Sequence, residues 1–194
     1  MCALRCPRGT SNNRKAALSF TVTFWGSLAL HNHHSALAVV QALSPVEPVT
    51  LVRPHAAARA ARFFVDRFPG KTLYAVKANP SPDLLRVLWD SGVTHYDVAS
   101  IAEVRLVART LPAAVLCFMH PVKAEEAIAE AYFTHGVRTF SLDSMTELSK
   151  VIRATKGAED LNLLVRLRVS SDHSKLSLAA KFGAEPDEVA DLLM

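Results

Sequence analysis

The sequence has few cysteines, little charge imbalance and no low-complexity stretch. Its three cysteines, Cys2, Cys6 and Cys117, lie in unrelated settings, which excludes a disulfide framework and favours a reducing, cytoplasmic location. The formal net charge of +4 is modest and the basic residues are scattered beyond the N-terminal segment, so we expect no nucleic-acid partner. With 50% hydrophobic and 21% charged residues, the composition is that of a soluble globular protein.

The first 36 residues differ from the rest of the chain. They begin with basic residues, continue with an apolar stretch over residues 16–30 and end with small residues at 36–38, which is the outline of a secretory signal. The apolar stretch is too short to predict a membrane span. We expect an atypical extension over residues 1–36. It is an unrelated leader, an organelle-targeting segment or a true signal, in that order of preference. His31, His33 and His34 cluster here, but without a partner carboxylate or cysteine pair they predict no metal site.

Strand-like and helix-like stretches alternate from residue 73 onwards. Apolar runs with strand character lie at 73–77, 94–98, 114–119, 137–142 and 161–169. Helical spacing occupies 84–89, 102–110, 123–134 and 145–154. This alternation predicts parallel strands joined by crossover helices, either as a barrel or as a doubly wound sheet.

Polar residues at the predicted strand ends favour the barrel, where the site is assembled from the C-terminal ends of several strands. Those ends carry Lys77, Asp97, His120 with Lys123, Asp143, and Arg166 with Arg168. No glycine-rich phosphate loop follows the first strand, so the doubly wound sheet lacks its usual cue. We therefore predict an α/β fold, the N-terminal portion of a (β/α)8 TIM barrel truncated after about five β/α units.

Lys77 has the most informative chemistry, because it ends an apolar run that a turn follows. Burying an unpaired ammonium costs several kcal/mol, so an amine in such a place tends to lose its proton and become a nucleophile. A neutral lysine forms a Schiff base with an aldehyde, and pyridoxal phosphate is the usual aldehyde that proteins hold in this way. The alternative is a lysine whose stem lines the strand while its amine reaches water at the sheet edge.

Five motifs in register resemble the ornithine, diaminopimelate and arginine decarboxylase family. They are YAVKAN at 74–79, YDVAS at 96–100 with Glu103, HPVK at 120–123, FSLDS at 140–144 with Glu147, and LVRLR at 164–168 followed by KFGA at 181–184. The last motif is most similar to the ornithine/lysine decarboxylase branch.

The resemblance implies a pyridoxal 5'-phosphate enzyme of the alanine-racemase-like fold, with a barrel followed by a β-domain and an active site completed across a homodimer. It implies that Lys77 is the catalytic residue that carries the cofactor. Asp97 and Glu103 match positions beside the cofactor. Arg166 matches the arginine that reaches the ring hydroxyl, and Lys181 a lysine near the dimer interface.

Several of these residues also have structural explanations. Asp97 suits the cap of the following helix, and Glu103 suits an ion pair with Arg105 or Arg109 on a solvated face. His120 either faces the site or is a loop histidine whose ring nitrogens are hydrogen-bonded within the loop.

Length limits what the chain can hold, since a complete barrel needs about 250 residues and the chain has 194. We expect a partial pyridoxal-phosphate-binding barrel over residues 37–194, without the second half of the barrel or the β-domain. The expected activity is decarboxylation of ornithine or lysine to the diamine, in polyamine biosynthesis, with this chain an inactive fragment of the enzyme. The alternatives are a catalytically inactive decarboxylase-like regulatory protein and a racemase-like pyridoxal-phosphate protein.

Overall fold

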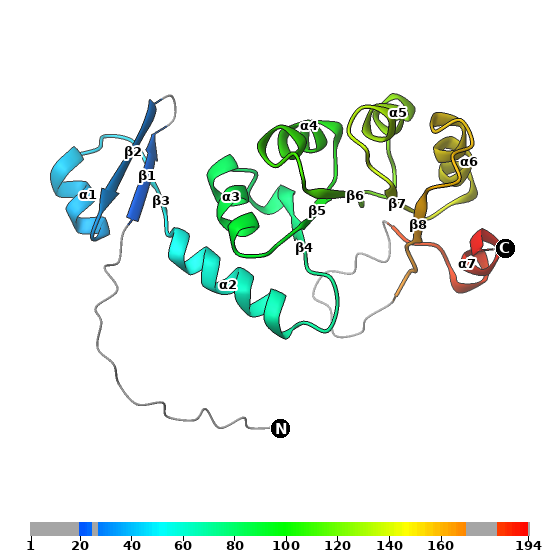
Figure 1. Cartoon of the computed structure of the whole chain (residues 1–194), viewed down its shortest axis with the longest axis horizontal. Helices are drawn as coiled ribbons and strands as arrows, with labels where there is room; N and C mark the ends of the chain where they lie inside the picture. Colours follow the sequence, from blue (N-terminus) through cyan, green and yellow to red (C-terminus); the bar gives the residue numbers. More distant parts are fainter. Residues whose placement is uncertain (1–19, 25–26, 170–181, 194) are drawn as a thin grey trace, which may run out of the picture. The chain divides into compact units, whose positions relative to one another are not determined.

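The computed structural model describes residues 20–24, 27–169 and 182–193. The chain divides into two compact units, Met1–Pro54 and His55–Met194 (Figure 1). The start of the barrel domain at residue 37 stays a prediction from the sequence.

The first unit contains a small antiparallel sheet. Its strands are ordered β2-β1-β3, with β1 at Phe20–Phe24, β2 at Ser27–His33 and β3 at Thr50–Val52. Helix α1, Ala36–Leu43, is capped by Ser35, whose side chain accepts a hydrogen bond from the Ala38 N–H at 3.1 Å. The apolar stretch at 16–30 contributes backbone to β1 and β2 in its described part. None of the described helices is long and apolar enough to cross a membrane.

The second unit is built on a five-stranded parallel sheet ordered β4-β5-β6-β7-β8, which confirms the predicted α/β class. Its strands are β4 Leu73–Ala75, β5 His95–Val98, β6 Val115–Phe118, β7 Thr139–Leu142 and β8 Asn162–Val165. Its helices are α2 Pro54–Arg67, α3 Pro82–Asp90, α4 Ile101–Thr110, α5 Glu125–Phe133, α6 Met145–Ala154 and α7 Pro186–Leu193. Helices α3 to α6 connect successive strands and lie along one side of the row of strands (Figure 1).

The register is staggered across the sheet. Ala75, the last residue of β4, pairs with Asp97, which pairs with Cys117, and Cys117 pairs with Thr139, the first residue of β7. Strand pairing that drifts along the chain direction in this way is the shear that a barrel requires.

The core lies between the strands and helices α3 to α6. Tyr96 and Val98 of β5 are fully buried against it, together with apolar residues of the helices such as Leu85 and Val104. The Tyr96 hydroxyl donates to the backbone oxygens of Leu85 (3.3 Å) and Val93 (3.2 Å), so the core holds this phenol without leaving it unpaired.

Asp97 lies between these two core residues of β5, so it points to the other face of the sheet. The helices thus cover one face, and the alternation of β5 turns a carboxylate toward the face that they leave uncovered.

Candidate active site

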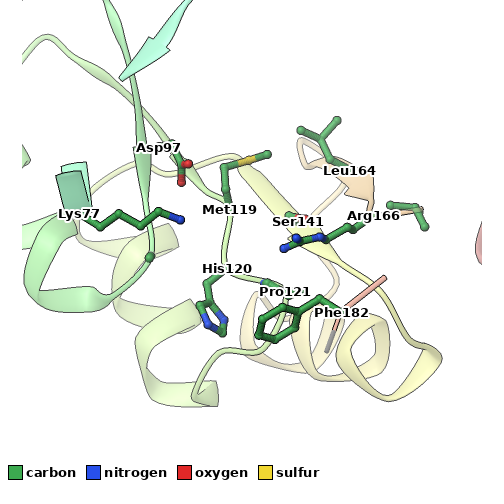
Figure 2. Close-up of a pocket in the computed structure, with 11 residues that line it drawn as sticks. Lys77, Asp97, Met119, His120, Pro121, Ser141, Leu164, Arg166 and Phe182 are labelled. Atoms are coloured by element: carbon green, nitrogen blue, oxygen red, sulfur yellow. The ribbon is translucent and has the colours of Figure 1, made fainter. Parts of the chain in front are cut away.

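The C-terminal ends of the five parallel strands surround a cavity of about 600 Å³. Each strand contributes to its lining: Lys77 follows β4, Asp97 lies in β5, His120 follows β6, Ser141 lies in β7 and Arg166 follows β8. Figure 2 shows Lys77 and Arg166 extending toward each other from opposite sides of the cavity, with Asp97 nearby. The structure therefore brings together three of the residues that the sequence predicted for the cofactor, Lys77, Asp97 and Arg166.

Lys77 does not end a strand as expected. Strand β4 stops at Ala75, and Val76–Ala78 forms a short 3-10 helix. Val76 is completely buried and anchors this turn, while Lys77 beside it is exposed. The expectation of a lysine shielded from solvent is wrong for this chain, because the turn directs residue 77 out of the core. Its side chain lines the cavity from the solvent edge, which is the alternative that the sequence left open.

Asp97 is half-buried, and this burial raises the pKa of its carboxyl. The ammonium of Lys77 acts in the opposite sense and lowers that pKa, and the Glu103 carboxylate raises it. An effect of Lys77 on Asp97 requires the two groups to lie near each other. Asp97 does not cap the following helix, since the N-cap of α4 is Ser100.

Glu103 does not line the cavity and acts on it through its charge and through the backbone. Its Oε2 accepts a hydrogen bond from the Ala99 N–H at 2.7 Å, while the Ser100 hydroxyl accepts from the Glu103 N–H at 3.3 Å. The second bond is that of an N-cap, whereas the first holds the residue before the cap, so together they fix Ala99 and Ser100 to the first turn of α4. The alternative ion pair with Arg105 does not form, because Arg105 binds Glu130 at 2.6 Å. Glu103 therefore positions Ala99, which lines the cavity.

Arg166 is held on both sides of its backbone. Its N–H donates to the Leu142 oxygen at 2.8 Å, and its own oxygen accepts from the Ala184 N–H at 2.8 Å. Its guanidinium lies 5.2 Å from the ring centre of Phe182, and the same ring contacts the His120 imidazole edge-on at 5.6 Å between centres. Phe182 lines the cavity and had no role assigned from the sequence, although the KFGA motif contains it.

The position directly after Phe182 requires glycine. The φ of Gly183, 102°, is in the left-handed region, and a Cβ there would lie 2.8 Å from the backbone nitrogen of Arg168, so only glycine fits. Its N–H donates to Asp143 Oδ2 at 3.0 Å. Asp143, which the sequence placed at a strand end, therefore anchors this segment beside the cavity.

Lys123 is a buried cation directly behind the cavity wall. Its side chain is 0% exposed, and its Nζ donates to the backbone oxygens of His120 (3.0 Å), Pro121 (3.3 Å) and Ser141 (2.6 Å) and lies 2.9 Å from Glu147 Oε1. Burial lowers the pKa of this amine, and the hydrogen bond and charge of Glu147 oppose that effect. The sequence pointed to Lys123 as a strand-end residue but assigned it no partner.

Two predictions fall outside the residues whose side chains the structure describes. Lys181, expected at a dimer interface, is one of them, and so are His31 and His33 of the histidine cluster. In the described part of the chain, no group of three or more His, Cys, Asp or Glu side chains is arranged to hold a metal ion.

Comparison with known proteins gives consistent matches. A family model described as the pyridoxal-binding domain of pyridoxal-dependent decarboxylases matches residues 54–194. The chain is 35% identical over 121 residues to a lysine/ornithine decarboxylase of Selenomonas ruminantium, covering 62% of this chain and 30% of that protein. It is 32% identical over 124 residues to antizyme inhibitor 2 of Homo sapiens, covering 63% and 26%.

The structural match agrees with these similarities. The fold superposes on that of SrLDC in complex with PLP and cadaverine with a TM-score of 0.63 and 29% identity, over 82% of this chain and 39% of that one. The chain therefore spans well under half the length of the relatives that it matches.

Replacing Glu147 with alanine is expected to lower the free energy of unfolding by about 3 kcal/mol, because the buried Lys123 ammonium loses its counter-ion. The matched control is Glu125→Ala, which removes an exposed ion pair to Arg153 (2.9 Å) and is expected to change stability little. Urea unfolding followed by circular dichroism measures both. Equal effects of the two substitutions would contradict a buried, fully paired Lys123.

Two lysine substitutions test whether Lys77 lies beside Asp97. Lys77→Met is expected to raise the pKa of Asp97, since the Lys77 ammonium lowers it. Lys71→Met is expected to raise the pKa of His95 instead, because burial and then the Lys71 ammonium lower that pKa. NMR titration of both groups in both variants gives the measurement. A pKa of Asp97 that responds to neither lysine, or equally to both, rules out the placement.

Proposed function

The chain belongs to the family of pyridoxal-dependent decarboxylases, whose pyridoxal-binding domain its residues 54–194 match, and we propose that it supplies the lysine-bearing part of an active site that decarboxylates ornithine or lysine. The observation that carries this proposal is the convergence of Lys77, Asp97 and Arg166 on one cavity at the C-terminal strand ends. The predicted family resemblance and the predicted cofactor, pyridoxal 5'-phosphate, are confirmed by the family match.

The residues around the cavity fit this cofactor. The cavity volume of about 600 Å³ lies within the range of small-molecule sites. Lys77 offers a primary amine for the aldehyde from an accessible position, and Arg166 offers a fixed positive charge for the phenolate oxygen. These are the residues that would hold the group, one covalently and one by charge.

The chain's own residues provide the electrostatic frame for decarboxylation. Bound pyridoxal phosphate supplies an electron sink for the carbanion that forms when carbon dioxide leaves. Asp97 stabilises a positive charge on the nitrogen at the Lys77 position, since the two groups interact favourably when both are charged. Arg166 cannot move far, because its backbone is bonded on both sides and its guanidinium rests against Phe182.

The proposal extends to assembly and location. Lys77 is exposed at the cavity, and Leu164 on the opposite side is 45% exposed, so a second protein surface has room to cover the site and exclude water. We propose that a second copy supplies this surface in a cytoplasmic homodimer that makes polyamines, with Lys181 near the interface.

A second candidate is a decarboxylase-like protein that binds a partner and catalyses no reaction. One observation favours it, which is the 32% identity to a relative named antizyme inhibitor 2. The racemase-like alternative has no such observation behind it. Covalent attachment of the cofactor separates the first candidate from the second.

Incubation with pyridoxal 5'-phosphate and reduction with borohydride are expected to attach the pyridoxyl group preferentially to Lys77, as mapped by peptide mass spectrometry. The matched control is Lys71, which is also exposed, precedes the same strand and lies at the opposite edge of the sheet. We expect about tenfold more label at Lys77, the effect of roughly 1.4 kcal/mol of additional contacts.

Lys77→Ala should abolish this preference and Lys71→Ala should leave it intact. Equal labelling of both lysines in the unmodified chain rejects the proposed cofactor site and favours the partner-binding candidate.

A further inference from the structure

His120 has one of its two ring nitrogens committed to its own loop. Nδ1 lies 3.1 Å from the Val122 backbone nitrogen. A backbone N–H can only donate, so Nδ1 must be the acceptor, and the proton of the neutral ring is on Nε2. Within the described part of the chain, no hydrogen bond engages Nε2.

The loop that carries His120 is held by several hydrogen bonds. Lys123 Nζ binds the backbone oxygens of His120 and Pro121 on this loop and that of Ser141 at the end of β7. The Lys123 N–H also donates to Glu147 Oε1 at 3.1 Å. Lys123 thus closes the loop on itself through His120 and Pro121, joins it to β7 through Ser141, and joins it to α6 through the ion pair with Glu147.

The imidazole ring is supported from its other side by Phe182. The two rings meet edge to face, with an interplanar angle of 79°. Figure 2 shows His120 and Phe182 together at one end of the cavity, below Lys77 and Arg166. With the Nδ1 side bound to the loop and Phe182 against the ring, the Nε2–H is the polar group that His120 offers to a ligand.

We propose that His120 is a ligand-binding residue of this cavity and that its Nε2–H donates to an anionic oxygen of the bound molecule, with Lys123 as the positioning residue. Lys77 and Arg166 give the same cavity two positive charges against the single carboxylate of Asp97, which favours an anionic ligand. The inference rests on the proposed function. The oxygen belongs either to the cofactor or to the amino-acid carboxylate, which separate additions distinguish.

NMR of the full chain with isotope-labelled histidine tests the proposal. The probes are pyridoxamine 5'-phosphate, which has no aldehyde to react with Lys77, and ornithine. We expect the Nε2–H tautomer at His120 before addition and a shift of its Nε2 resonance with one probe. That probe identifies the source of the oxygen.

Three variants give matched affinities for the probe that binds. His120→Phe keeps an aromatic ring beside Phe182 but has no donor, and we expect about tenfold weaker binding, as for one charge-assisted hydrogen bond. His120→Gln places an amide N–H near the Nε2 position and should recover most of the affinity. His135→Phe changes a histidine whose Nε2 already faces Glu130 at 3.3 Å and should have no effect.

Lys123→Met tests the positioning role through the tautomer. We expect the His120 signals to show both tautomers while the remaining spectrum stays folded, and Glu147→Gln is the milder variant should Lys123→Met unfold. Unchanged His120 signals in a folded variant overturn the role of Lys123.

The ligand-binding proposal is overturned by an Nδ1–H tautomer, or by an Nε2 resonance that neither probe shifts. Borohydride trapping at Lys77 in the same samples separates the two claims. Trapping without any change at His120 rejects this inference and keeps the proposed function, whereas the absence of both rejects both.

Discussion

Parallel strand pairing is the constraint on which the site depends. All five strands from β4 to β8 run in one direction, so the residues that end or follow them gather at one edge of the sheet. The helices cover one face and bury Tyr96 and Val98, which leaves Asp97 on the other. The polar residues that border the cavity are far apart in the chain, and the parallel order of the strands brings them close together in space.

Two lysines near this edge show how differently the fold treats one chemical group. Lys123 has a fully buried side chain and its donors are committed to backbone oxygens and Glu147. Lys77 is exposed and has Asp97 as a nearby carboxylate. An argument from burial alone would select Lys123 as the reactive amine, yet a lysine whose hydrogens all serve the structure is not available for chemistry. The accessible Lys77 is the one that a cofactor can reach.

The sequence predicted the order of the strands from β4 to β8 and of the helices between them, because the apolar spacing of each element is a local property, whereas β1 to β3, α1 and α2 were not predicted. The predicted end of β4, at residue 77, was wrong by two residues. The chain leaves the strand after Ala75 and forms the turn Val76–Ala78, and the apolar pattern, which continues through Val76, does not reveal this turn. The N-cap at Ser100, three residues before Glu103, was readable from its spacing, and Glu103 was instead interpreted as a cofactor contact or an ion pair.

The support of the cavity wall depends on contacts that no local pattern reveals. Lys123 bonds to Ser141, 18 residues away, and Gly183 bonds to Asp143, 40 residues away. The position of Phe182 beside His120 and Arg166 follows from the second of these contacts. The sequence could therefore name Lys77, Asp97 and Arg166 as site residues but neither Phe182 nor the bonds that hold the cavity wall.

Backbone NMR of the chain during titration with pyridoxal 5'-phosphate tests the central claim most directly, which is that the ligand occupies the C-terminal edge of the parallel sheet. We predict shifts of the amide signals of Lys77, Ala99, His120 and Arg166, with those of His95, Val115 and Asn162 at the opposite ends of their strands unchanged. Shifts at those opposite strand ends, or spread evenly over the second unit, would contradict the account.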